Sequence, residues 1–235
     1  MKHQEQIEAY WSDPAREREL VGAIARLVNV KSVKGDPEPG KPFGPGPAAA
    51  LDEALALCRE LGFSTSDYDH YVGLADLNDK ETRLHILGHL DVVGEGSGWD
   101  TDPYTCVEKD GMLYGRGVSD DKGPVVCALL AMKAVRDLGL PLSANVRCIL
   151  GTDEESGSAD IASITPGSPT PPWPSPPTPT SLSSTLRRAT IIRTSAPSGR
   201  APTPSPGWPP SPAGSAPTWY LPRPRPWYWA FTPTM

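Results

Sequence analysis

The chain has 235 residues, 38% of them hydrophobic, and a net charge of −6, which allows a domain with a buried core and argues against a nucleic-acid partner. That average hides two unlike segments. All 28 acidic residues and 16 of the 22 basic ones lie in residues 1–160, whereas residues 161–235 carry six Arg and no acid. The second segment also contains 20 of the 29 prolines and lacks Asp, Glu, His, Lys, Asn, Gln, Cys and Val.

Residues 163–235 are predicted to form a disordered, Pro-rich tail. Their Pro, Ser, Thr, Gly and Ala residues bury too little apolar surface to offset the entropy of an ordered chain. Proline stretches such as 171–174 and 222–226 also suit SH3-like or WW-like domains, so a non-catalytic chain with a Pro-rich binding tail is an open alternative.

The remaining composition predicts a cytoplasmic protein without a membrane or nucleic-acid partner. Residues 1–11 are polar and lack the apolar core of a signal peptide, and the longest apolar run, 125–132, is too short to cross a bilayer. The four cysteines are widely spaced and are expected to stay reduced. The oligomeric state is left open.

The predicted elements alternate between helices and strands. Helices are expected where apolar residues recur at helical spacing between capping residues, over 15–28, 48–61 and 124–138. Short strands are expected over 63–69, 71–77, 84–90 and 145–150, with a hairpin formed by 104–108 and 112–114. This alternation predicts a layered α/β domain.

A histidine and a carboxylate end the strand over 84–90, in the sequence Gly88-His89-Leu90-Asp91. Alternation along a strand directs His89 and Asp91 to the same side. This pair suits a metal-ligating histidine beside a carboxylate, or an acid/base pair. A structural histidine gives the same pattern, so this motif alone does not decide.

Two further motifs place carboxylates next to one another. Residues 115–123 contain Asp120 and Asp121 before a helix, and a bound cation would relieve their repulsion. Glu154 and Glu155 follow an apolar strand, where one could bind metal while the other takes a proton from water. The alternatives are a solvated turn with a helix-capping Asp and an acidic helix N-terminus.

Together and in this order, the motifs resemble those of the M20 metallopeptidase family, in particular its bacterial dipeptidases of the PepV and Sapep type. The resemblance covers roughly residues 5–162 and includes Pro42-Phe43-Gly44, residues 98–104 and residues 151–160. It implies that residues 1–162 are the N-terminal portion of a two-metal aminopeptidase-like catalytic domain, a mixed sheet flanked by helices.

The resemblance also implies a set of metal ligands. His89 would bind one metal ion, Glu155 would bind the other, and Asp120 would bridge the two, with a cis peptide bond to Asp121. The cofactors would be two divalent ions, Zn²⁺ or Mn²⁺.

Two catalytic roles follow from the same resemblance. Glu154 would be the general base, and Asp91 would orient the metal-binding histidine. The reaction would be hydrolysis of the peptide bond of a dipeptide or small peptide by a metal-bridging water. The related alternative is an amidohydrolase or deacylase acting on N-acyl amino acids.

The family pattern further requires an Asp ligand after the Glu pair, a distant His ligand and a lid domain. Residues 161–235 contain no Asp or His, so each metal would keep two of three protein ligands, and we expect this chain to be inactive. We also expect a poorly soluble or partly folded product, with an exposed sheet edge and one exposed apolar face.

A change of reading frame near Ala162–Ser163 would explain the tail. With suitable codons, the shifted frame of residues 163 onward can spell a segment resembling the one that carries the missing Asp. We therefore interpret residues 163–235 as out of frame. The nucleotide sequence tests this interpretation: an uninterrupted family-like frame in another phase is expected, and its absence would refute the idea.

Overall fold

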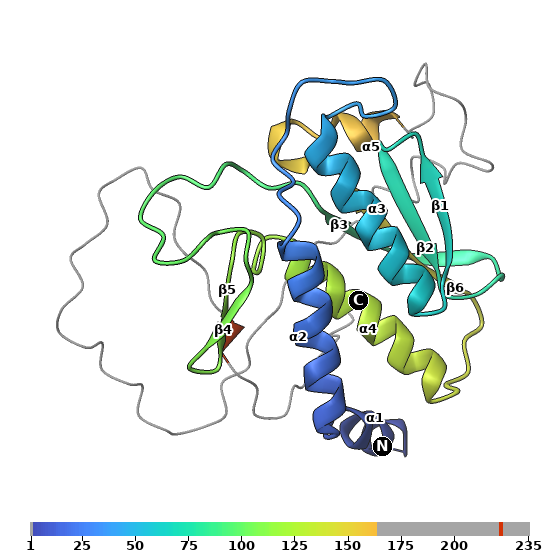
Figure 1. The fold of residues 1–235 in the computed structure, drawn as a ribbon. Coiled ribbons are helices and arrows are strands. Elements are labelled where there is room, and N and C mark those ends of the chain that lie inside the picture. Colours follow the sequence, from blue (N-terminus) through green and yellow to red (C-terminus); the bar gives the residue numbers. More distant parts are fainter. Residues whose placement is uncertain (1, 164–220, 223–235) are drawn as a thin grey trace, which may run out of the picture.

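The computed structural model describes residues 2–163 and 221–222, and within them the predicted α/β fold is confirmed (Figure 1). In chain order the elements are α1 (Lys2–Trp11), α2 (Pro14–Val28), α3 (Pro45–Glu60), β1 (Ser64–Tyr68), β2 (Val72–Asp76), β3 (Thr82–His89), β4 (Val107–Lys109), β5 (Met112–Tyr114), α4 (Lys122–Asp137), β6 (Asn145–Gly151), the 3-10 turn η1 (Glu154–Ser156), α5 (Ala159–Ser163) and β7 (Leu221–Pro222). Apart from Ser163 and β7, the predicted disordered and out-of-frame tail lies outside the described residues.

The central sheet is mixed, with the strand order β1-β2-β6-β3. The pairs β1–β2 and β2–β6 are antiparallel, whereas β3 and β6 run parallel. In the parallel pair His89 lies opposite Gly151. The carboxyl ends of β3 and β6 therefore meet at one edge of the sheet, and the segments that follow them start side by side.

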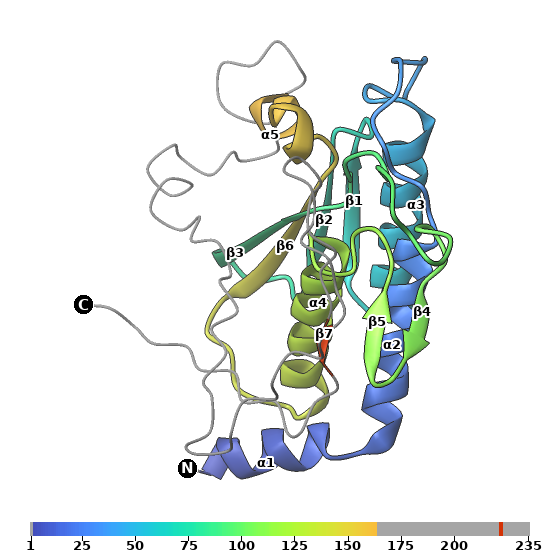
Figure 2. The same cartoon turned by 90° about the vertical axis from the view of Figure 1, so that its left-hand side faces the viewer.

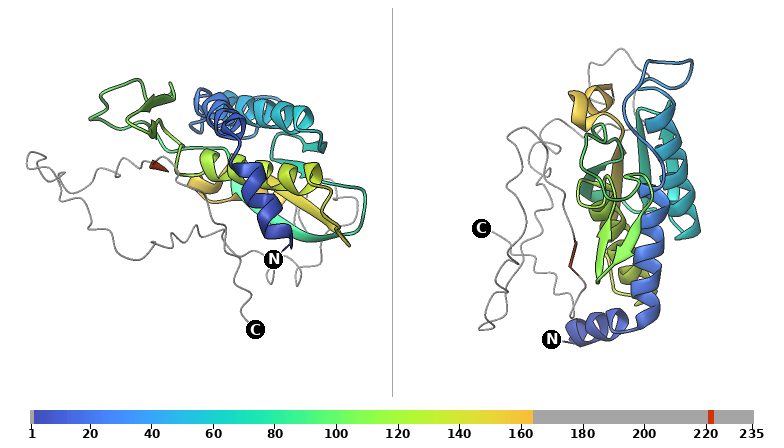
Figure 3. Two further views of the ribbon diagram at one scale, coloured as in Figure 1. Left: turned by 90° about the horizontal axis from the view of Figure 1, so that it is seen from below. Right: turned by 60° about the vertical axis from the view of Figure 1, so that its left-hand side comes forward.

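Helices cover one face of this sheet (Figure 3). The helix α3 packs on β1 and β2, α4 packs on β3 and β6, and α2 packs on both helices. Alternation along β2 directs Gly73 and Ala75 toward this face, and a Cβ on Gly73 would lie 2.6 Å from Leu51 of α3. On the opposite face Val72, Leu74 and Ile149 form a small second cluster.

The helix boundaries differ from the prediction by a few residues. The predicted helix starts at residue 48, but α3 begins at Pro45. Proline has no N–H and a fixed φ, so it fits the first turn of a helix, and Gly44 supplies the φ of +88° that turns the chain into it. The helix α4 likewise begins at Lys122 rather than Pro124.

The helix α1 has no counterpart among the predicted elements. Figure 2 shows it lying across the base of α2. Tyr10 donates a hydrogen bond to Asp137 of α4 (3.0 Å), and Lys133 bonds the Tyr10 hydroxyl (3.2 Å). Contacts with residues more than 120 positions away thus tie this polar segment to the domain. No helix in the described residues is long and apolar enough to cross a membrane.

The outer edge of β3 generates a prediction about solubility. Among the described strands β3 pairs only with β6, and Leu84 and Leu87 are 41% and 38% exposed. Such an edge promotes association with other chains. We expect Leu87→Lys to raise the soluble fraction of the expressed chain and to change the free energy of unfolding by less than about 0.5 kcal/mol.

Centrifugation and urea titration measure these two quantities. Leu74→Lys is the comparison, because Leu74 is only 1% exposed and a buried lysine there should unfold the chain. An unchanged soluble fraction in Leu87→Lys would show that this edge does not drive association.

Candidate metal centre

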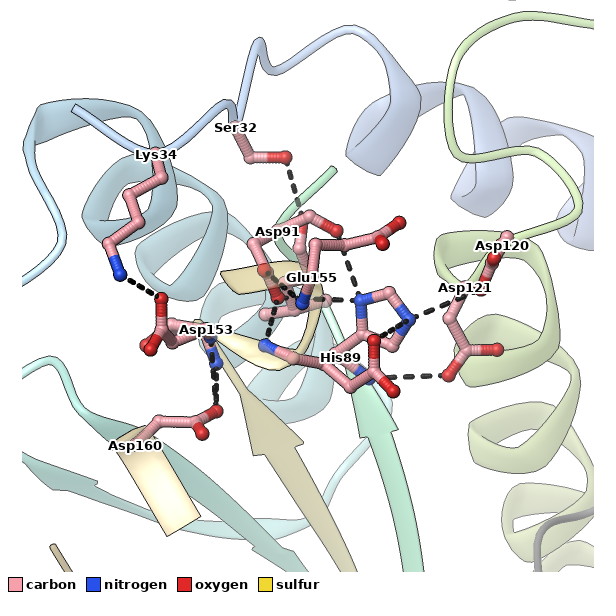
Figure 4. Close-up of polar contacts among 12 residues, drawn as sticks. Ser32, Lys34, His89, Asp91, Asp120, Asp121, Asp153, Glu155 and Asp160 are labelled. Atoms are coloured by element: carbon pink, nitrogen blue, oxygen red, sulfur yellow. Dashed lines mark hydrogen bonds and ion pairs between the residues drawn. The ribbon is translucent and has the colours of Figure 1, made fainter. Parts of the chain in front are cut away.

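Three chain segments meet at the carboxyl edge of the sheet (Figure 4). One is the end of β3 with the residues that follow it, and it carries His89 and Asp91. The second precedes α4 and carries Asp120 and Asp121. The third follows β6 and contains η1 with its two glutamates. Because β3 and β6 are parallel neighbours and α4 packs on both, segments distant in the sequence converge here.

The structure brings the three predicted ligands together. One ligand atom each from His89, Asp120 and Glu155 lie within 4.8 Å of one another. His89 Nε2 is 3.2 Å from Asp120 Oδ1. A group of one imidazole and two carboxylates matches the nitrogen and oxygen ligands that bind Zn²⁺ and Mn²⁺. These residues fit a divalent cation.

Main-chain and side-chain contacts fix the His89 ring. Its Nδ1 lies 3.0 Å from the Asp91 carbonyl oxygen and 3.4 Å from the Asp91 carboxylate. The backbone N–H of His89 donates to Asp121 Oδ2 at 3.2 Å. With Nδ1 held by Asp91, Nε2 is directed to Asp120. A role of Asp91 in orienting the ring thus has a geometric basis in its carbonyl as well as its carboxylate.

The Asp91 carboxylate makes a second connection, which the sequence did not predict. It accepts hydrogen bonds from the backbone N–H groups of Glu154 (3.1 Å) and Glu155 (3.0 Å) and is 1% exposed. One buried carboxylate therefore joins the end of β3 to the segment after β6. The Glu154 side chain lies beside the group, with Oε2 4.0 Å from His89 Nε2.

Asp121 is half-buried beside the ligand group. The peptide bond between Asp120 and Asp121 is cis, as the family resemblance implies. A Cβ on Gly88 would lie 2.8 Å from Asp121 Oδ2, so only glycine leaves room for this carboxylate beside β3. Burial raises the pKa of Asp121 to about 6, and the neighbouring Asp120 and Glu154 add to the shift.

The local electrostatics favour a positive charge at the centre. Burial and the Asp120 carboxylate raise the pKa of Glu155. For His89, burial acts to lower the pKa, but the hydrogen bond to Asp91 and the surrounding carboxylates outweigh it and raise the pKa to about 9. A bound cation would compensate the clustered carboxylates.

Two further buried acids shape the segment after β6. Asp160 is 1% exposed and accepts hydrogen bonds from the backbone N–H groups of Thr152 (2.7 Å) and Asp153 (3.1 Å). Asp153, also 1% exposed, is paired with Lys34. Both acids belong to the motif over 151–160. A single sequence gives no signal that Asp160 accepts backbone hydrogen bonds and that Asp153 pairs with a lysine.

Comparison with known proteins shows what this chain is similar to. Residues 85–170, which contain all the residues of the ligand group, match the Peptidase family M20/M25/M40. The resemblance to the M20 peptidases is confirmed. "Putative dipeptidase YtjP" of Bacillus subtilis (strain 168) is 39% identical over 143 residues, which are 60% of this chain and 31% of that protein. "Putative dipeptidase SH1171" of Staphylococcus haemolyticus is 37% identical over 150 residues, 62% of this chain and 32% of that protein.

Solved structures give the same picture of the fold. Human carnosine dipeptidase 1 is 31% identical with a TM-score of 0.57, covering 67% of this chain and 36% of that one. The di-peptidase Dug1p from Saccharomyces cerevisiae, at 20% identity and a TM-score of 0.56, shares the fold over the same fractions. The chain spans about a third of the length of these proteins.

The protonation of His89 generates a prediction about pH. Its folded-state pKa of about 9 lies above the ordinary 6.5, so protonated His89 stabilises the fold fully below pH 6.5, and this contribution is lost as the pH rises through 9. Burial lowers the pKa of Lys122 to about 7, so the free energy of unfolding increases as the pH rises above 7. This increase is the same in wild type and in every variant that keeps Lys122. The difference between wild type and His89→Gln should isolate the histidine.

We expect wild type, held in chelator, to be more stable than His89→Gln at pH 6.5 and to lose that advantage by pH 9. Urea titrations at several pH values measure the difference, and His3→Gln, which removes an exposed imidazole, is the matched control. A difference for His89→Gln that stays constant from pH 6.5 to pH 9 would contradict the prediction.

Proposed function

We propose that the described domain is the metal-binding part of a dipeptidase that uses two divalent ions, Zn²⁺ or Mn²⁺, to hydrolyse the peptide bond of dipeptides. The observation that carries the proposal is the convergence of His89, Asp120 and Glu155 with the Glu154 carboxylate beside them. The dipeptidase names of the relatives support the substrate class.

The residues divide into ligands and a base. His89, Asp120 and Glu155 would hold the metal, which when bound supplies Lewis acidity to the peptide carbonyl and lowers the pKa of water. Glu154 accepts a proton from the attacking water and passes it to the leaving amine. Its exposure of 44% leaves the carboxylate open to a substrate, and its backbone N–H is fixed by Asp91.

We further propose that this 235-residue chain does not turn over dipeptides. Catalytic zinc sites normally keep three protein ligands per metal, and a pair of metals needs more than one imidazole and two carboxylates. Residues 161–235 contain no His, Asp, Glu or Cys to add. The cytoplasmic location and the identity of the metal stay predictions.

Metal binding and turnover can be tested separately on this chain. Titration with Co²⁺, followed by its visible absorption, is expected to show binding that is weakened at least about tenfold in His89→Gln. Glu154→Gln should bind Co²⁺ nearly as wild type does, because the general base is not a ligand. Glu17→Gln, an exposed residue of α2, is the matched control.

Dipeptide hydrolysis is then assayed with Zn²⁺ or Mn²⁺ in excess, and none is expected from any of these chains. Turnover by wild type that Glu154→Gln abolishes would overturn the proposed inactivity and support the proposed base. Failure of wild type to bind Co²⁺ would overturn the proposed metal site.

A further inference from the structure

Residues 30–34, which follow α2, touch every segment that carries a predicted ligand. We call these residues the strap. None of them belongs to the ligand group, and no motif in the sequence marks them. Their contacts with the end of β3, the start of α4 and the segment after β6 are independent of one another.

The first contact holds the end of β3. Ser32 is fully buried, and its hydroxyl donates to the Leu90 carbonyl at 2.6 Å. The backbone N–H of Val92 donates to the Ser32 carbonyl at 3.2 Å, and Val33 forms a parallel bridge with Val92. The strap thus pairs with the main chain on both sides of Asp91.

The second contact reaches the start of α4. Lys122 is fully buried, and its Nζ donates to the Val30 carbonyl at 2.7 Å. Burying an ammonium group is unfavourable unless it is hydrogen-bonded, so this bond is expensive to lose. Because Lys122 follows Asp120 and Asp121 directly, it connects the strap to their segment.

The third contact reaches the segment after β6. Lys34 Nζ lies 2.6 Å from Asp153 Oδ1, and the Asp153 side chain is fully buried. The Lys34 ammonium also lies 5.1 Å from the centre of the Phe43 ring. Figure 4 shows Lys34 extending from the strap toward Asp153, immediately before the two glutamates.

The first turn of helix α3 packs closely against the strap. A Cβ on Gly46 would lie 2.7 Å from the Lys31 carbonyl and 3.0 Å from the Val33 carbonyl. Real Cβ atoms do not approach backbone atoms this closely, so Gly46 is the residue that allows α3 to hold the strap against β3. By contrast, a Cβ on Gly22 of α2 would meet nothing within 4 Å.

We propose that the strap is a positioning element that fixes the three ligand-bearing segments relative to one another, with Ser32 and Lys34 as positioning residues. Ligands on three separate segments must be held within a fraction of an ångström, and hydrogen-bonded supporting groups provide that precision. This proposal rests on the proposed function only for the statement that the three segments bind metal. The positioning role of the strap is supported by its contacts alone.

The test combines two readouts on the full chain. Hydrogen exchange of the metal-free protein, followed in peptides spanning 88–92, 118–122 and 151–156, reports the mobility of the three segments. Co²⁺ titration reports the ligand geometry. The variants are Lys34→Met and Gly46→Ala, with Lys41→Met, from the exposed Lys41–Glu38 pair, and Gly22→Ala as matched controls.

We expect Lys34→Met to speed exchange in the 151–156 peptide and to weaken Co²⁺ binding about tenfold, and Lys34→Arg to restore both. Gly46→Ala should speed exchange in all three peptides. Neither control should change either readout. Lys34→Met combined with Asp153→Asn removes the unpaired buried charge and serves if the single variant does not fold.

Exchange at wild-type rates in Gly46→Ala and in a folded Lys34 variant would overturn the proposed positioning role of the strap. Exchange that rises equally in all peptides of the chain would show general destabilisation and would also overturn it. If wild type binds no Co²⁺, the proposed metal site fails, but the exchange measurements still decide whether the strap positions these segments.

Discussion

The site depends above all on the parallel pairing of β3 with β6. That pairing places His89 opposite Gly151, so the residues after each strand leave the sheet at the same level. The Asp91 carboxylate then closes the gap by accepting the N–H groups of Glu154 and Glu155. A shift of the register by one residue would reverse the faces of a strand and separate these partners. The register of β3 against β6 therefore also determines the relative positions of the ligands.

The centre gathers buried charge at a density that a domain core does not tolerate without compensation. Asp91, Lys122 and Asp153 are each at most 1% exposed. Asp91 is compensated by two N–H groups and an imidazole, Lys122 by a carbonyl, and Asp153 by a lysine. Removing one partner would leave an uncompensated buried charge, which costs about 3–5 kcal/mol. An arrangement that separates one of these pairs leaves a buried charge unpaired, so the pairs favour the observed positions of the segments.

The sequence predicted the parts of this structure that local patterns determine. Alternating helical and strand spacing gave the order of the major elements, and the motifs around His89, Asp120 and Glu155 pointed to residues that the fold brings within 4.8 Å. The α1 helix and the strap escaped prediction for one physical reason. Both are polar segments held by partners far away in the chain, as Lys34 is by Asp153, and no local periodicity encodes such contacts.

Asp160 shows why the abrupt change in composition leaves the ligand group intact. It is the last acidic residue of the chain, and its carboxylate accepts the N–H groups of Thr152 and Asp153. A Cβ on Gly151 would lie 2.6 Å from Asp160 Oδ2, so the end of β6 is shaped to receive this side chain. With Asp160 in place, the turn that carries Glu154 and Glu155 is closed by residues on its own side of the change. Among the described residues, the contacts from Asp91, Lys34 and Asp160 that hold this turn lie within residues 30–160. Residues 161–235 contain no His, Asp, Glu or Cys that could add a ligand.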